Sequence, residues 1–383
     1  MNNYKHEVNV MRKVMLLIPI VLAVVTAGEI EITYKNTHDS TEQKAAVYIP
    51  KGYTNGPAPL LAVTHYLGGS RFTARETGYY PECEKRGWIC VCSELHGHRS
   101  GPQTAFASIE SQHDVIDAIA AVRAKYRIDS TRIYLTGKSM GGMLAGIMAA
   151  KYPDYFAAII AGQGISDLHT WIRQSPMFRN DVEKECGAYT DSTKFEYARR
   201  SSVNYAGNLV QVPLFLWHGT NDTWVPPSHS RILHDAIVKL SPWTPDVKWL
   251  YGSPHCGVST TLDWECDQLA LYQNLCELRQ NVPGRFLQTF SITTDEDKRY
   301  YWIDVKRRDR DAFGNVSASI HGDTAVLSLK NIRSAELVPS YIAKNIMISA
   351  YRIGTDMGTD VIYQQDTLKI KKFASGVFSK IKK

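Results

Sequence analysis

The feature that most constrains this fold is a GxSxG motif between a strand-like run and a helix-like run. It reads GKSMG over residues 137–141, with a β-branched segment at 132–136 before it and an apolar segment at 139–150 after it. Flanking glycines permit a tight turn that lifts the serine hydroxyl above the edge of a sheet. This context predicts that Ser139 is a nucleophile and not part of an ordinary turn.

From about residue 29 to 279, short apolar runs alternate with amphipathic segments. This alternation predicts a doubly wound, mostly parallel α/β sheet with helices on both faces, in a domain covering 28–282. We expect strands over 30–34, 45–49, 60–65, 88–93, 132–136, 157–161, 213–218 and 246–250. We expect helices over 114–126, 139–150, 228–239 and 262–279. The helix from Asp114 is the clearest, because its apolar residues recur at helical spacing.

After residue 282 only strand-length runs remain. They cover 286–292, 300–305, 325–329, 346–350 and 367–370, with turn signals at 313–315 and 321–323. Such a pattern predicts a β-rich, sandwich-like second domain over 283–383. A chain of 383 residues is long enough for one large and one smaller domain.

The beginning of the chain has the order of a signal peptide. Arg12 and Lys13 precede an apolar run at 14–25, and small residues follow up to Ala27. We therefore expect residues 1–27 to be removed and the protein to be secreted or periplasmic, without a membrane span in its mature form. Disulfides are possible there, although seven cysteines leave at least one unpaired. Cys90 and Cys92 share one face of a strand and cannot easily pair with each other.

Composition excludes several classes of function. A hydrophobic content of 44% is too high for a disordered chain, and a net charge of +6 is too small for a nucleic-acid-binding surface. His96 and His98 share a face, but no carboxylate or cysteine stands near them at ligand spacing. We therefore expect no metal and no cofactor.

A serine hydroxyl needs a base and an orienting carboxylate, which should follow at strand ends. Asp222 stands at the tip of the loop after the strand at 213–218, and His255 lies in a Gly/Pro-rich loop before the last helix. The alternative for Asp222 is a turn residue. The other histidines are weaker candidates for the base. His218 belongs to the end of the strand at 213–218, and His65 precedes both Ser139 and Asp222 in the chain.

At 133–142, 217–222 and 253–255 the sequence resembles the α/β-hydrolase fold, in the prolyl oligopeptidase-like branch that includes secreted acetyl xylan and feruloyl esterases. The resemblance implies Ser139 as nucleophile, His255 as general base and acid, and Asp222 as the residue that orients the imidazole. It also implies a hydrolase of carboxylic esters, acting through an acyl-enzyme on acetyl or feruloyl groups of plant or algal polysaccharide.

The oxyanion hole is expected to combine two backbone N–H groups. One belongs to Met140, and the other comes from the loop at 65–70, with Leu67 favoured and Tyr66 as the alternative. The resemblance to the peptidases of this branch leaves a third possibility open, in which the Tyr66 hydroxyl is the second donor. An aromatic insertion at about 165–211 occupies the place of a lid. Trp171 and Trp224 are candidates for substrate binding, although such aromatics can equally pack the insertion together.

Three other functions remain open. One is a prolyl oligopeptidase-like peptidase, although the chain has no room for the propeller domain that precedes the larger peptidases. The second is a polyester or lipid esterase. The third, of another class, is a carbohydrate-binding protein with a vestigial hydrolase. In the favoured function the partner is an ester-bearing small molecule or polysaccharide.

Overall fold

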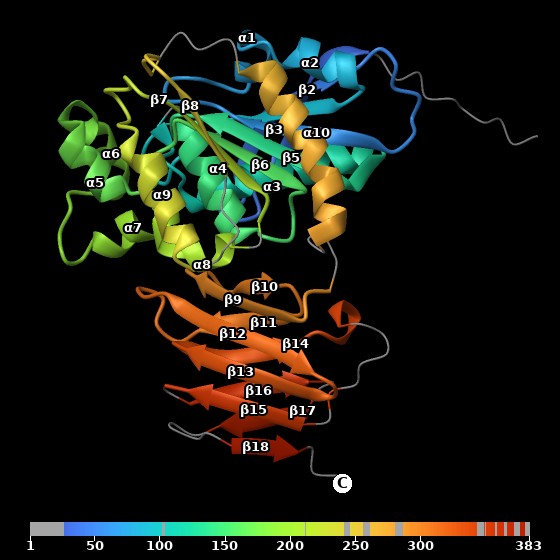
Figure 1. Cartoon of the computed structure of the whole chain (residues 1–383), viewed down its shortest axis with the longest axis vertical. Coiled ribbons are helices and arrows are strands. Elements are labelled where there is room, and N and C mark those ends of the chain that lie inside the picture. The colour runs from blue at the N-terminus through green and yellow to red at the C-terminus, as the bar shows by residue number, and fades with distance from the viewer. Residues whose placement is uncertain are drawn as a thin grey trace, which may run out of the picture.

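The computed structural model describes residues 27–101, 104–210, 212–240, 246–255, 261–279, 286–342, 348, 350–356, 358–363, 366–370 and 376–379. An α/β unit and a β-rich region are stacked along the long axis of the molecule (Figure 1). The predicted signal peptide, apart from Ala27, lies outside the described residues. No helix in the described ranges is long and apolar enough to cross a membrane.

An eight-stranded sheet forms the centre of the α/β unit. Its strands are β1 (Gly28–Lys35), β2 (Glu42–Ile49), β3 (Ala58–Thr64), β4 (Ile89–Ser93), β5 (Ile128–Lys138), β6 (Ala158–Gly162), β7 (Leu214–Gly219) and β8 (Asp246–Leu250). Their order is β1-β2-β4-β3-β5-β6-β7-β8, antiparallel from β1 to β4 and parallel from β4 to β8. All eight predicted strands are present, and the predicted fold class is confirmed.

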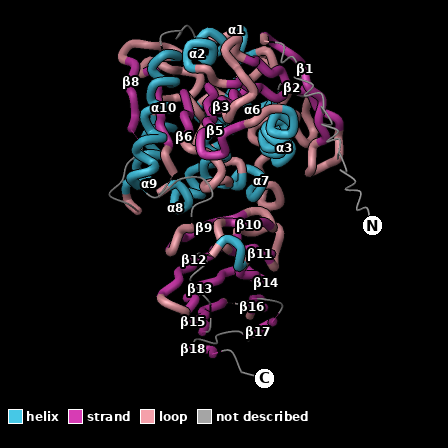
Figure 2. Tube along the Cα trace, turned by 90° about the vertical axis from the view of Figure 1, so that its right-hand side faces the viewer, coloured by secondary structure: helices cyan, strands magenta, loops and turns pink. Residues whose placement is uncertain are grey.

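Helices cover both faces of this sheet (Figure 2). One face carries α3 (Ile109–Lys125), α4 (Met140–Lys151) and α9 (Ser228–Val238), and the other carries α1 (Thr73–Glu76), α2 (Tyr79–Arg86) and α10 (Leu262–Arg279). Successive strand residues point to opposite faces, so Leu60 joins one core and Leu61 the other. Burial on both faces explains why these strands read as continuous apolar runs.

Helix α3 begins five residues earlier than predicted. It starts at Ile109 and not at Asp114, because Ser108 caps it by accepting a hydrogen bond from the Ser111 N–H at 3.0 Å. Its first turn includes Glu110 and Ser111, whose polar side chains interrupt the apolar periodicity. The cap, and not the apolar pattern, marks the start of this helix.

The β-rich region consists of two five-stranded sheets around a shared core, which confirms the sandwich-like prediction. Its strands are β9 (Thr289–Thr294), β10 (Lys298–Tyr300), β11 (Ile303–Arg307), β12 (Gly314–His321), β13 (Thr324–Lys330), β14 (Ile332–Leu337), β15 (Ala350–Thr355), β16 (Thr359–Tyr363), β17 (Asp366–Ile370) and β18 (Gly376–Ser379). The sheet orders are β10-β11-β14-β16-β17 and β18-β15-β13-β12-β9.

Two local predictions in this region are wrong. The run at 300–305 is a hairpin of β10 and β11 that turns at Tyr301, whose φ is +52°. The proposed turn at 313–315 instead contains the start of β12, whose alternation of buried Val316, Ala318 and Ile320 is hidden by short polar neighbours. The turn at 321–323 is confirmed, but most of 346–350 lies outside the described residues.

An insertion between β6 and β7 lies beside the sheet (Figure 1). It contains α5 (Leu168–Gln174), α6 (Arg179–Cys186), α7 (Lys194–Arg199) and α8 (Ala206–Leu209), with short 3-10 turns between them. Among the described cysteines, Cys83, Cys90, Cys92, Cys186 and Cys266 are buried free thiols. Cys90 and Cys92 share one core, as expected for residues two apart on a strand.

A buried ionic cluster joins the β-rich region to the α/β unit. Lys151, the last residue of α4, is fully buried, and its Nζ lies 2.9 Å from Asp295 Oδ1 and 2.7 Å from Glu296 Oε2. Arg199 Nε lies 2.9 Å from Asp295 Oδ2. The Asn208 Nδ2 also donates to the Thr293 carbonyl at 2.9 Å. The loop after β9 is therefore fixed against the far end of the helix that follows Ser139.

Candidate active site

Ser139 lies at the sharp turn from β5 into α4, with φ at +60° and ψ at −121°. Such a backbone is strained for any residue except glycine, and it is held by the hydrogen bond from the Ser139 N–H to the Gly162 carbonyl at 2.9 Å. Close packing around Ser139 leaves no room for a side chain at Gly137 or at Gly141. A Cβ at Gly137 would lie 2.0 Å from Thr64 Oγ1, and one at Gly141 would lie 2.2 Å from the Thr64 carbonyl.

The two predicted partners of Ser139, His255 and Asp222, are joined to it by successive hydrogen bonds. His255 Nε2 is 2.9 Å from Ser139 Oγ, and His255 Nδ1 is 2.6 Å from Asp222 Oδ2. A carboxylate only accepts, so Nδ1 carries the proton and Nε2 is left to accept the serine proton. Asp222 follows β7, and His255 lies in the loop after β8, so both stand at the carboxyl ends of neighbouring strands.

Asp222 is held as an ionised carboxylate. Its Oδ1 accepts the N–H groups of Trp224 at 3.0 Å and of Val225 at 2.9 Å. Burial alone would raise the pKa of Asp222, but hydrogen bonds from His218 and His255 lower it to about 2. His218 is fully buried and donates from Nε2 to the Val225 carbonyl at 2.8 Å, so it helps to fix the Asp222 loop.

Met140, Tyr66 and Leu67 line the same cavity as Ser139, and their backbone N–H groups have no acceptor within the described part of the chain. The Tyr66 carbonyl accepts the Gly69 N–H at 2.9 Å. The His65 carbonyl faces Gly141, since a Cβ there would lie 2.9 Å from its oxygen. In a trans peptide the C=O and N–H point in opposite directions, so the Tyr66 N–H is directed away from the start of α4. This favours Leu67 over Tyr66 as the second donor.

A cavity of about 460 Å³ opens at Ser139 and His255. One end is apolar and aromatic, lined by Leu67, Phe106, Ile165, Trp171, Phe178 and Trp224. Trp171 stacks on Phe178 with ring centroids 4.9 Å apart, and the Trp171 Nε1–H donates to the Trp224 carbonyl at 2.8 Å. The Trp224 side chain is 44% exposed, and its ring lies 5.4 Å from that of His255.

Aromatic residues of the insertion both line the cavity and pack against one another. Trp171 and Phe178 line the cavity, whereas Tyr189 stacks on His169 with ring centroids 3.6 Å apart. Phe195 contacts Phe313 of the β-rich region with ring centroids 5.0 Å apart. The insertion contributes to the cavity wall and also packs internally.

Sequence reasoning missed one polar residue that lines the cavity, Glu265. Glu265 of α10 is buried and accepts hydrogen bonds from Tyr79 Oη at 2.7 Å and from Thr136 Oγ1 at 2.8 Å. Burial raises the pKa of Glu265. Its position in the first turn of α10 gave no signal, because acidic residues are common there and only the tertiary fold brings α10 against β5 and α2.

A buried ion pair fixes the loop that carries Phe106 into the cavity. Glu185 accepts the backbone N–H groups of Arg99 at 2.9 Å and of Ser100 at 2.8 Å, and it lies 2.9 Å from Arg200 Nη2. Arg200 Nη1 donates in turn to the Ala105 carbonyl at 3.0 Å. The pair thus links the insertion to the wall of the cavity.

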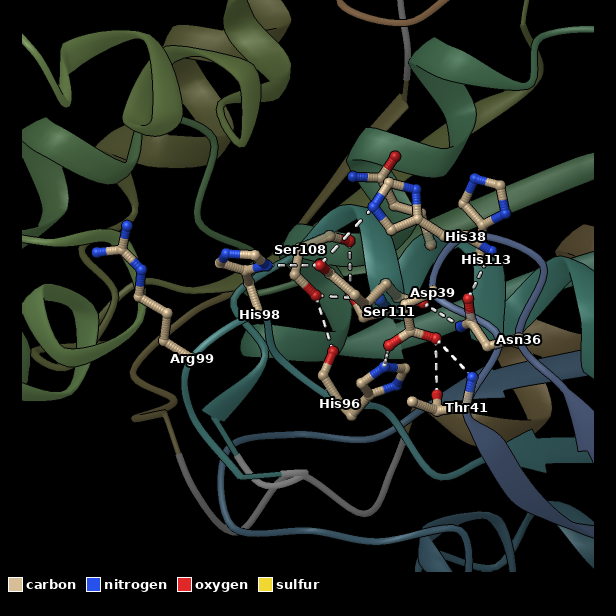
Figure 3. A network of polar contacts seen from close by, with 12 residues as sticks. Asn36, His38, Asp39, Thr41, His96, His98, Arg99, Ser108, Ser111 and His113 are labelled. Carbon is tan, nitrogen blue, oxygen red and sulfur yellow. Dashed lines mark hydrogen bonds and ion pairs between the residues drawn. The ribbon is translucent and has the colours of Figure 1, made fainter.

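The histidines considered as metal ligands belong to a polar network at the start of α3 (Figure 3). His96 lies between two carboxylates, with Nδ1 2.7 Å from Asp114 and Nε2 3.0 Å from Asp39. Burial would lower the pKa of His96, but the bonds to Asp114 and Asp39 raise it to about 9. His98 Nδ1 is 2.8 Å from Glu110. Carboxylates distant in sequence therefore pair with both histidines, which the spacing did not reveal.

Comparisons with known proteins agree with this geometry. Residues 108–276 match the prolyl oligopeptidase family. The chain is 28% identical over 188 residues to an acetylxylan esterase from Coprinopsis cinerea, covering 46% of this chain and 49% of that protein. It is 25% identical over 288 residues to a probable acetylxylan esterase A from Aspergillus flavus, covering 72% and 89% of the two chains.

A solved Mycobacterium tuberculosis puromycin-hydrolyzing peptidase has a similar structure, with a TM-score of 0.53 at 19% identity over 64% of this chain and 39% of that one. At that identity the similarity shows the fold alone. The chain spans about half the length of the Coprinopsis relative. Together these comparisons confirm the predicted α/β-hydrolase fold and the resemblance to the prolyl oligopeptidase-like branch.

Proposed function

Because the chain has an α/β-hydrolase fold and resembles the prolyl oligopeptidase-like branch, we propose that it is a serine esterase that cleaves acyl groups from carbohydrate esters. The observation that carries the proposal is the contact of Ser139 with His255, and of His255 with Asp222, at the mouth of a cavity. Relatives named acetylxylan esterase support acetyl esters of polysaccharide as substrates, and a relative named feruloyl esterase B supports feruloyl esters.

In the proposed reaction Ser139 Oγ attacks the ester carbonyl carbon while His255 Nε2 takes the serine proton. The carbonyl oxygen becomes negative and is stabilised by the N–H groups of Met140 and Leu67. The tetrahedral intermediate collapses, the alcohol leaves with the proton from His255, and the acyl group stays on Ser139. Water, deprotonated by His255, then releases the acid and restores the hydroxyl. Asp222 accepts the hydrogen bond from His255 Nδ1 throughout and stabilises the imidazolium each time it forms.

We expect activity to rise with pH in a single step, because only neutral His255 can accept the serine proton. Asp222 adds no second step between pH 4 and 9, since its pKa is lowered to about 2 and it is ionised over that whole range. The measurement is kcat/KM for a p-nitrophenyl ester between pH 4 and 9. Two separate ionisations on the acidic side of this pH profile would contradict the assignment of His255 as the base and of Asp222 as a carboxylate that stays ionised.

Esters should be cleaved faster than amides. An alkoxide is a far better leaving group than an amide anion, so cleavage of an ester depends less on a well-placed proton from His255 than cleavage of an amide does. Acetylated xylan, a feruloyl ester and a proline-containing peptide amide are compared at equal enzyme concentration. We expect the better ester to exceed the amide by at least roughly a hundredfold in kcat/KM, about 2.7 kcal/mol in transition-state binding. Faster cleavage of the peptide would indicate the peptidase function instead.

We further propose that the protein acts outside the cytoplasm. The support is the order of basic, apolar and small residues in 12–27. Buried cysteine thiols are compatible with this location, because burial raises the pKa of Cys92 to about 12 and keeps the reactive thiolate rare.

A further inference from the structure

His65 lies directly before the loop that offers the second oxyanion donor, and it is fully buried. Its Nε2 lies 3.1 Å from the backbone nitrogen of Leu95, in the loop after β4. Its Nδ1 lies 2.9 Å from the carbonyl oxygen of Tyr66. The ring therefore links two loops, and one of them carries the peptide between Tyr66 and Leu67.

These two contacts determine where the proton of the neutral ring must be. The Leu95 N–H can only donate, so Nε2 is the acceptor and Nδ1 carries the hydrogen. The Nδ1–H then donates to the Tyr66 carbonyl, which can only accept. Burial lowers the pKa of His65 and so favours this neutral form. A base needs a free ring nitrogen facing the substrate, and neither nitrogen of His65 is free.

The hydrogen bond to Tyr66 has a direct consequence for the oxyanion hole. It fixes the Tyr66 carbonyl toward His65, together with the bond from the Gly69 N–H at 2.9 Å. The chain contains no cis peptide among its described bonds, so the Leu67 N–H points the opposite way. In that direction the Leu67 N–H has no acceptor in the described structure. Leu67 itself lines the cavity.

We propose that His65 is a positioning residue that aims the Leu67 N–H at the oxygen that becomes negative during catalysis. It acts through the Tyr66 carbonyl and does not touch the substrate. The inference rests on the proposed function, because an oxyanion hole matters only if the chain is a serine hydrolase. Rigid donors of this kind need not reorganise when charge develops, which is the source of their effect on rate.

Two substitutions separate the two contacts of the ring. In His65→Asn the side-chain amide stands near the position of Nδ1 and can still donate to Tyr66, but it cannot reach Leu95. In His65→Gln the amide stands near the position of Nε2 and can still accept from Leu95, but it leaves the Tyr66 carbonyl unheld. Each variant thus keeps one contact and loses the other, and each serves as the control for the other.

We expect His65→Gln to lower kcat for p-nitrophenyl acetate by roughly 10- to 100-fold with KM within about threefold, because a misplaced donor weakens transition-state binding and not substrate binding. The inhibition constant of phenylboronic acid, whose adduct with serine places an oxygen in the hole, should rise by a similar factor. His65→Asn should keep kcat within about threefold of wild type despite losing the Leu95 contact. Thermal unfolding of both variants is measured alongside.

A purely structural His65 gives a different result. The two variants would then lose activity in parallel with their unfolding temperatures, without a split between kcat and KM, and that outcome would overturn the inference. If His65→Gln does not fold, a tenfold fall in kcat for a well-folded His65→Asn would overturn it as well. A wild-type protein that neither cleaves the ester nor reacts with a fluorophosphonate would overturn the proposed function itself, and this inference with it.

Discussion

Replacing Ser139 with alanine should lower kcat for a short p-nitrophenyl ester by on the order of a millionfold, since the loss of a triad nucleophile has that effect in well-studied hydrolases. In the proposed reaction the hydroxyl forms the acyl-enzyme, and His255 Nε2 is 2.9 Å from it. It contributes little to packing because Ser139 is only partly buried. The strained turn is also maintained by the backbone bond to Gly162, which alanine keeps.

The measurement combines initial rates with mass-shift labelling by a fluorophosphonate. Wild type should gain one label and Ser139→Ala none, while both unfold at the same temperature within a few degrees. Ser166 is a matched control, because its hydroxyl is buried and donates to the His229 carbonyl at 2.8 Å, away from the reacting groups. A Ser139→Ala enzyme that retains a tenth of the activity would place the nucleophile elsewhere.

The double substitution Asp295→Asn and Glu296→Gln should lower the free energy of unfolding by about 3–5 kcal/mol, because a buried charge without its partner is costly. Both carboxylates contact Lys151, whose side chain is completely buried. Arg199, which is 18% exposed, loses its contact with Asp295 as well. The neutral amides keep the size of the side chains, so the change removes charge more than packing.

Urea unfolding at pH 7 measures this effect. Asp304→Asn is the matched control, because its pair with Arg299 is partly exposed and should contribute less than about 1 kcal/mol. Adding Lys151→Met to the double variant should restore part of the lost stability, since an apolar chain does not need a carboxylate. A double variant as stable as wild type would mean that the cluster is solvated or rearranges.

The same cluster changes how the β-rich region should be studied. Lys151 ends the helix that begins directly after Ser139, so the loop after β9 supports the nucleophile helix at its far end. Removing residues after 282 would take away both carboxylates that Lys151 contacts and uncover the end of α4. Truncation is therefore expected to destabilise the hydrolase as well as to remove any role of the β-rich region in substrate binding. Point substitutions on its surface separate the two effects.

The position of the proposed nucleophile could be predicted from the sequence because it depends on local rules. A strand, a glycine-flanked serine and a helix in immediate succession leave few conformations open. The central strands β3, β4, β6 and β7 were equally readable, since burial on both faces makes each a continuous apolar run, whereas β1 was readable from its alternation of buried and exposed residues. Asp222 and His255 followed from their order along the chain and their places after strands.

Other features depended on contacts between segments far apart in the sequence. The β12 strand was missed because its buried residues alternate with serines that resemble a turn. The carboxylates beside His96 come from a hairpin and a helix that are distant along the chain. Spacing along the chain carries no information on such pairs.

The sequence by itself determined the fold class and the residues Ser139, Asp222 and His255 as candidates, because periodicity and turn chemistry act over a few neighbouring residues. Only the tertiary structure decided how the oxyanion loop is held. In sequence His65 is one of twelve histidines, and its ring orientation depends on a backbone N–H thirty residues away at Leu95. Hydrogen bonds need both partners within about 3 Å, and that distance exists only after the sheet has formed.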